Sequence, residues 1–120
     1  LWECKTMNAK NWRACVKDGV AKSKPVYAAQ IAIYQAYMEA QVPGISAAPA
    51  VFTAINKDTA ELHHELVPFD AGLAQRMSDR GVRILQATDA GDLLPRVAAN
   101  RDFFECRFCS WAERCWGLPT

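Results

Sequence analysis

The chain has 120 residues, of which 51% are hydrophobic and 22% charged. It is therefore long enough for one modest core and too apolar to be intrinsically disordered. No apolar run reaches membrane-spanning length and no signal peptide is visible, so we expect a cytoplasmic protein without a membrane partner. Because the chain begins without Met, directly in a strand-like stretch, we also expect a preceding segment that pairs with that strand.

The net charge of +1 is distributed unevenly. Residues 1–24 contain six Lys or Arg and two acidic residues, a balance of +4, whereas the other 96 residues sum to −3. A basic region of this kind suits a polyanion such as DNA. The alternative is an ordinary solvated surface of helix and loop.

The first seven residues predict a half-buried β-strand. Side chains alternate along a strand, so Glu3 and Lys5 point to one side and Cys4 to the other, toward the expected core. A carboxylate and an ammonium on an apolar strand suit the mouth of a metal site, where Glu3 binds a hard divalent cation and Lys5 orients water or stabilises phosphate charge. The alternative is a surface ion pair on an edge strand.

Two helices should follow. Asn8 to Gly19 has apolar residues at helical spacing, Val20 to Pro25 reads as a basic linker, and Val26 to Gln41 is apolar nearly all the way round, which predicts a largely buried helix. In that helix Gln30 and Tyr34 are four residues apart and share a face. The alternative is a solvated Gln30 beside a core tyrosine.

The middle of the chain predicts a β-hairpin, with strands at 50–55 and 60–67 joined by a turn at 56–59. His63 and His64 are neighbours on a strand, point apart, and are expected to be structural or solvent-facing. Asp70 is a candidate N-cap for a helix through Leu73 and Met77, with Ile84 as a candidate for its far end and Gly81 weakening its middle. Residues 89–100 read as a looser connector.

The last twenty residues differ in kind. Cys106, Cys109 and Cys115 have C-x2-C-x5-C spacing among aromatic residues. A C-x2-C step commonly offers two thiolates to one metal or cluster, and the odd total of five cysteines favours an intracellular thiol or metal pattern over disulfides. The fourth ligand is open: Cys4, Cys15, an upstream residue or none. The alternative is aromatic packing around inert thiols.

The predicted elements follow one another in a definite order. A strand with Glu3-Cys4-Lys5 comes first, then a basic segment and a helix with Gln30-x3-Tyr34. A hairpin, a further helix and the terminal cysteines complete the order. This order resembles the PD-(D/E)XK nuclease superfamily, most of all its RecB-like and phage exonuclease branch, whose CRISPR-associated relatives carry a C-terminal cysteine cluster. The resemblance implies an α/β, restriction-endonuclease-like mixed sheet flanked by helices. It divides the chain into the C-terminal part of a nuclease domain, residues 1–100, and a cysteine-rich tail, residues 101–120.

The resemblance also implies functions for individual residues. Glu3 corresponds to the metal-binding carboxylate, Lys5 to the catalytic lysine, and Gln30 and Tyr34 to helix residues that organise the site and touch the DNA backbone. The cofactors implied are Mg²⁺ or Mn²⁺ and a [4Fe–4S] cluster, or Zn²⁺. The resemblance makes Cys106, Cys109 and Cys115 three of the four ligands of that cluster.

Three family features have no counterpart here: an aspartate on the strand before the E-x-K strand, an acidic residue or histidine on the preceding helix, and the first cluster cysteine. All three would lie upstream of Leu1. The resemblance therefore implies a metal-dependent deoxyribonuclease, with exonuclease action expected, in phage or bacterial recombination, repair or CRISPR-type processing. This chain alone is expected to be inactive or nearly so. The alternatives are a non-catalytic nucleic-acid-binding or assembly module held by a Zn or Fe–S site, and a zinc-ribbon structural protein in which Glu3 and Lys5 merely pair.

Overall fold

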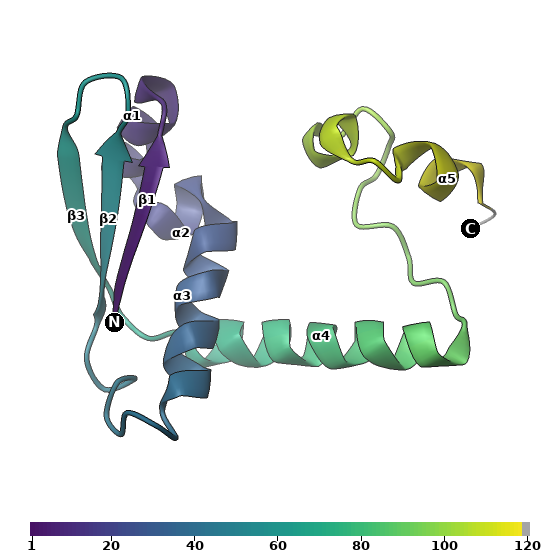
Figure 1. Ribbon diagram of the computed structural model, residues 1–120, viewed down its shortest axis with the longest axis horizontal. Helices are drawn as coiled ribbons and strands as arrows, with labels where there is room; N and C mark the ends of the chain where they lie inside the picture. The colour runs from purple at the N-terminus through teal and green to yellow at the C-terminus, as the bar shows by residue number, and fades with distance from the viewer. Residues whose placement is uncertain (119–120) are drawn as a thin grey trace. The chain divides into compact units, whose positions relative to one another are not determined.

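The computed structural model describes residues 1–118 and divides the chain into two compact units, residues 1–82 and 83–120. The first unit is built on a three-stranded sheet of β1 (Trp2–Met7), β2 (Ala50–Asn56) and β3 (Leu62–Val67), in that spatial order (Figure 1). β1 runs parallel to β2, and β2 runs antiparallel to β3. The predicted mixed sheet and the predicted hairpin are both confirmed.

Three helices cover one face of this sheet: α1 (Ala9–Asp18), α2 (Val20–Ser23) and α3 (Pro25–Met38) (Figure 1). Asn8 begins α1, because its side-chain oxygen accepts a hydrogen bond from the Asn11 amide at 2.9 Å. Pro25 begins α3 at a first-turn position where its missing N–H costs nothing. The parallel pair of strands requires such a helical crossover, and α1 to α3 supply it.

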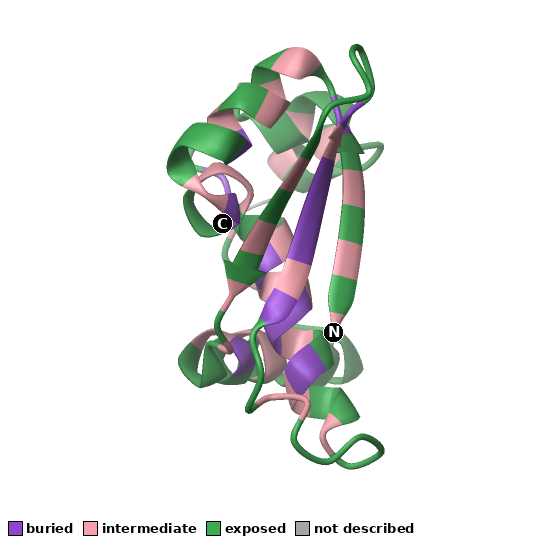
Figure 2. Cartoon of the chain, turned by 90° about the vertical axis from the view of Figure 1, so that its left-hand side faces the viewer, coloured by how far each residue is buried: buried purple, intermediate pink, exposed green. Residues whose placement is uncertain are grey.

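Figure 2 views the sheet from the face that the helices of the first unit leave uncovered. β2, in the middle, is the most buried strand, and the side chains of Ala50, Phe52 and Ala54 on its helix side are fully buried. They pack with Cys15, Val20, Ile31 and Met7 from the helices and β1 to form the core.

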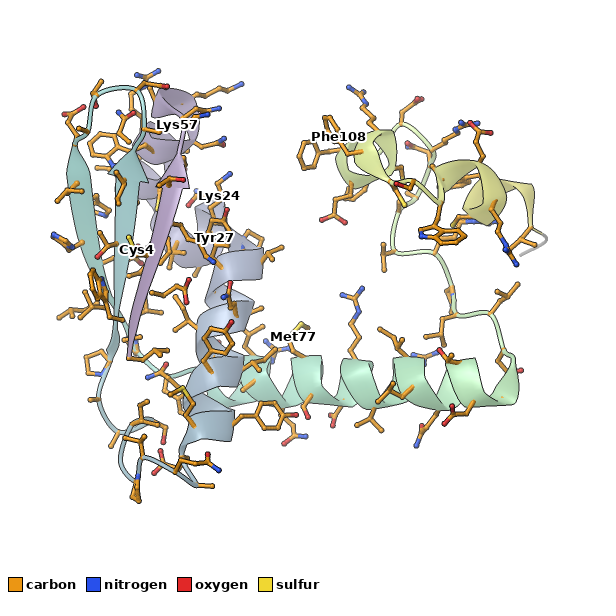
Figure 3. The ribbon with its side chains drawn as sticks, viewed as in Figure 1. Cys4, Lys24, Tyr27, Lys57, Met77 and Phe108 are labelled. Carbon is orange, nitrogen blue, oxygen red and sulfur yellow. The ribbon has the colours of Figure 1, made fainter. Side chains whose placement is uncertain are left out.

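The prediction that Cys4 is buried in the core is wrong, because Cys4 is exposed. The alternation along β1 is as expected, but Glu3, Lys5 and Met7 take the helix side, whereas Trp2 and Cys4 lie on the uncovered side. Figure 3 shows Cys4 on the opposite side of β1 from Tyr27.

Two predictions about the helices need correction. The expected linker contains α2, whose first residue, Val20, is fully buried. Its amide donates to the Glu65 carboxylate of β3 at 2.8 Å, a stabilising contact from far along the chain. The helix expected at 26–41 is α3, and it is not buried all the way round, since Tyr34 and Tyr37 are exposed. Only one stripe is buried: Ala28, Ile31, Ala32 and Gln35.

The remaining helices are α4 (Ala71–Ala90) and, in the second unit, the short 3-10 helix η1 (Phe104–Phe108) and α5 (Ala112–Gly117). Asp70 is the predicted N-cap of α4, since its Oδ1 accepts from the Leu73 amide at 2.8 Å. α4 extends into the expected connector, and the start of that connector is therefore helical. None of the helices described between residues 1 and 118 has both the length and the hydropathy needed to cross a membrane.

Candidate functional site

The side chains of Glu3 and Lys5 lie on the helix side of β1 and form an ion pair. Lys5 Nζ is 2.9 Å from Glu3 Oε1. The Glu3 side chain is only 13% exposed and that of Lys5 25%, so the pair is largely removed from water. β1 is an edge strand of the described sheet, as the alternative interpretation of the sequence required, but the two paired side chains are mostly covered and not on the open surface. Charges so placed cost desolvation energy, which their attraction and hydrogen bond offset in part.

The environment of Lys5 favours its charged form. The hydrogen bond with Glu3 raises the pKa of Lys5 above its ordinary value of 10.5, against the opposing effect of burial, and the charge of Glu3 with the nearby Tyr27 and Tyr34 adds to the increase. The ammonium also lies over the Tyr27 ring, 5.2 Å from its centroid. A cation over an aromatic face is attracted by the ring quadrupole. Lys5 is therefore an ammonium at neutral pH.

The helix residues implied by the resemblance lie on the same side of the sheet. Gln30 is half-buried and its Nε2 donates to the Tyr34 hydroxyl at 2.9 Å. Tyr34 is close enough to Lys5 to act on its charge. The structure thus pairs Glu3 with Lys5 and Gln30 with Tyr34, and Tyr34 contributes to the charge environment of Lys5. The catalytic roles of all four residues stay predictions.

Sequence reasoning missed Tyr27, which stacks beside Phe52 with ring centroids 6.2 Å apart and supports the Lys5 ammonium. A signal was present: Tyr27, Gln30 and Tyr34 are at positions i, i+3 and i+7, which place them on one helix face. Figure 3 shows Tyr27 of α3, and Lys24 immediately before that helix, on the side of β1 that faces the helices. The face of α3 toward Lys5 is therefore a continuous polar–aromatic strip and not a single Gln–Tyr pair.

A second carboxylate on the helix side of the sheet is too far from Glu3 to complete a metal site. Glu3 pairs with Phe52, and Phe52 pairs with Glu65, so the two carboxylates are two strands apart with the Phe52 side chain between them. Two strand spacings amount to about 9.6 Å, which is a longer distance than a single ion can bridge between two carboxylates. Glu65 is also occupied at the start of α2, where the Val20 amide donates to it.

The histidines add no ligand. The β2–β3 register places His63 opposite Ala54, on the helix side, and His64 opposite Thr53, on the uncovered side. His64 Nδ1 is 2.9 Å from the Thr53 hydroxyl, which also accepts from Trp2 Nε1 at 2.8 Å. His64 therefore takes part in a hydrogen-bonded row across the sheet, consistent with the structural role expected for it.

Glu3 is the single carboxylate of this site, and Mg²⁺ requires more oxygen ligands than one. Among residues 1–118, no three His, Cys, Asp or Glu side chains come together as a metal site. The described residues therefore fit a divalent cation only in part: Glu3 would supply one ligand.

The tail cysteines are not gathered either. Cys106 lies in η1, Cys109 directly follows it, and Cys115 lies in α5, where it lines an apolar cavity of about 500 Å³ with Trp111 and Arg114. The predicted convergence of three sulfurs on one point is not seen within the described part of the chain. Arg96 orders α5 instead: its guanidinium donates to the Cys115 carbonyl at 2.7 Å and lies over the Trp116 ring. As placed, the three sulfurs do not fit a cluster.

Three kinds of comparison were made with known proteins. No protein-family model, no curated protein and no solved structure matches the chain. What can be said of its function therefore depends on its own residues: a largely buried Glu–Lys pair on β1, faced by a polar–aromatic strip of α3.

Proposed function

We propose that this chain contributes the E-x-K half of a metal-dependent DNA nuclease site that hydrolyses phosphodiester bonds. One observation carries the proposal. The strand places Glu3 and Lys5 side by side, largely buried, against the α3 face that bears Gln30 and Tyr34. These are the four residues to which the resemblance assigns the site, and they come from elements that are distant in sequence.

The energetics support a functional reason for the pair. An apolar pair of similar size at positions 3 and 5 would avoid the desolvation cost of two charges, and such replacements are often neutral or stabilising. Perturbed charges on an otherwise consistent fold concentrate at functional sites. The Glu3–Lys5 pair contradicts the apolar pattern of the core on which it lies, so we attribute it to chemistry.

Each residue has a role that its position suits. Glu3 would provide one oxygen ligand to a divalent cation, and the cation when bound supplies an activated water and neutralises phosphate charge. Lys5, held as an ammonium, would stabilise the negative charge that develops on the scissile phosphate. Tyr34 would donate its hydroxyl to a phosphate oxygen, and Gln30 would orient Tyr34 through the bond they share. A protonated Lys5 is suited to this electrostatic role and not to removing a proton from water.

A second candidate is a nucleic-acid-binding or assembly module without catalysis. The observation that favours it is that, among residues 1–118, no three His, Cys, Asp or Glu side chains come together as a metal site. The two proposals differ in one measurable property: a binding module loses nothing chemical when Glu3 is neutralised, whereas a nuclease stops cleaving.

The test uses the gene product that contains residues 1–120. We expect cleavage of labelled duplex DNA only with Mg²⁺ or Mn²⁺, and loss of cleavage in Glu3→Gln and Lys5→Met. Cys4→Ser is the matched control, because Cys4 lies between the two residues on the same strand but on the uncovered face. Cleavage that persists in both site variants, or that fails equally in the control, would contradict the proposal. The isolated chain should cleave weakly or not at all, because it brings one carboxylate to the site.

The cysteine cofactor stays a separate prediction. Iron and zinc analysis of anaerobically purified gene product tests it directly. Stoichiometric metal that disappears in Cys109→Ser would show that the tail rearranges around it, and metal-free folded protein would leave the tail as aromatic packing.

A further inference from the structure

The outer face of α1 carries an uninterrupted row of cations. Lys10, Arg13 and Lys17 are all exposed and follow one another at i, i+3 and i+7. At about 100° per residue they fall within an arc of about 60°. Trp12 and Cys15, on the opposite side of the same helix, pack against the core. We call these three cations the α1 basic row.

None of the three cations forms an ion pair with an acidic side chain of residues 1–118. The ion pairs among residues 1–118 join Lys5 to Glu3, Lys22 to Asp18 and Arg101 to Glu113. Asp18, the sole acidic residue of α1, is therefore occupied by α2. Ordinary solvated helix faces alternate charges of both signs, which stabilise the helix through pairs four residues apart. The α1 basic row makes no such pair and keeps its charge available.

We propose that the α1 basic row binds the phosphate backbone of double-stranded DNA. This inference rests on the proposed function in taking DNA as the polyanion, and it adds the surface that holds the substrate. From Lys10 to Lys17 the helix advances seven residue steps, or about 10.5 Å along its axis. Successive phosphates of one strand advance about 3.4 Å along the duplex axis, so about three phosphates occupy the same length. The three positive charges of the row therefore match about three phosphate charges over the same length.

α1 is also directly connected to the elements that carry the site. It follows β1 directly, with Asn8 between Met7 and its first turn. Lys24, immediately before α3, donates from Nζ to Asn11 Oδ1 of α1 at 2.9 Å. The helix that carries the row is thus tied at one end to the Glu3–Lys5 strand and along its side to the start of α3 (Figure 1).

The experiment measures binding alone. Fluorescence anisotropy of a labelled 20-base-pair duplex is recorded in EDTA between about 50 and 200 mM KCl, the range over which phosphate contacts weaken strongly. Each phosphate contact contributes about 0.9 to the slope of log K against log salt, so Lys10→Ala/Arg13→Ala/Lys17→Ala should flatten that slope by about 2.7. Over this fourfold salt range, the wild type should then lose roughly 40-fold more affinity than the variant. Alanine favours helix, so the fold should persist, which circular dichroism checks.

The matched control removes the same charge from another exposed helix row. Arg76, Arg80 and Arg83 of α4 are also seven residues from end to end, but Asp79 lies beside them on the same face. Arg76→Ala/Arg80→Ala/Arg83→Ala should leave the slope unchanged. An equal flattening in the control would mean general charge attraction and would overturn the proposal, as would an unchanged slope in the α1 variant or no binding by the wild type.

The same measurement with single-stranded DNA distinguishes a duplex partner from a single-stranded one. A stronger affinity for the single strand, with a slope change of about 2.1, would overturn the assignment to duplex. The outcome is also independent of catalysis. Binding that depends on the α1 basic row in a protein that never cleaves would remove the proposed nuclease function and leave this inference standing.

Discussion

Replacing Lys5 by Met should destabilise the first unit more than any surface ion pair could explain. The Glu3 carboxylate is 13% exposed and its counter-ion is Lys5, so the variant leaves a largely buried charge unpaired. An exposed pair contributes about 0–1 kcal/mol, and breaking a fully buried one costs about 3–5 kcal/mol. For this intermediate burial we expect a loss of about 1–3 kcal/mol in the free energy of unfolding.

The double variant Glu3→Leu/Lys5→Met should recover that loss. With both charges gone, no desolvation cost remains, and the stability should return to within about 1 kcal/mol of wild type or exceed it. Urea unfolding followed by circular dichroism, with NMR signals of β2 amides to report the first unit alone, gives both values. A loss below about 0.5 kcal/mol for Lys5→Met would show that the pair is solvated. A double variant as unstable as the single one would show that packing, not charge, holds these positions.

Three further predictions concern the neighbourhood of the site. Gln35→Leu should cost about 1–3 kcal/mol in urea unfolding, because the fully buried Gln35 amide donates to the carbonyls of Ile45 and Ala48. Tyr27→Leu should lose about 0.5–1 kcal/mol more than Tyr27→Phe, which keeps the aromatic face beneath Lys5, and equal losses would rule out a role for the ring. Hydrogen bonds from Gly44 and Ser46 lower the pKa of Glu39 below its ordinary value of 4.5. The ionised Glu39 carboxylate therefore stabilises the fold above about pH 4.5, and this stabilisation is lost as the pH falls through the lowered pKa. The stability gap between wild type and Glu39→Gln should accordingly be full at pH 7 and close on acidification, and a gap independent of pH would contradict this assignment.

Periodicity and capping were sufficient to predict most of the elements. Alternation along residues 1–7 gave the strand and the shared side of Glu3 and Lys5, and Asp70 gave the start of α4. Alternation alone does not say which side a strand turns to its helices. The side with the charges was the covered one, contrary to the apolar preference that placed Cys4 inside. That conflict between the local apolar pattern and the covered charges is one reason why we propose a functional site at this pair.

Other features depended on contacts that local sequence does not contain. α2 is four residues long, and its first amide is satisfied by Glu65, which lies 45 residues away on β3. Likewise, α3 buries its small residues and exposes two of its tyrosines, because Ala28 and Ala32 let the helix approach the sheet closely. The apolar content of this helix had instead predicted that it is largely buried all the way round. Tyr27 was missed for the same reason, since its function becomes visible only with Lys5 above its ring.

The most direct test of the account is a cleavage assay on three proteins of known stability: the wild-type gene product, Glu3→Leu/Lys5→Met and Cys4→Ser. We expect the double variant to be as stable as wild type and inactive on duplex DNA with Mg²⁺, while Cys4→Ser stays active. A folded double variant that still cleaves DNA would show that the Glu3–Lys5 pair is not part of the catalytic site.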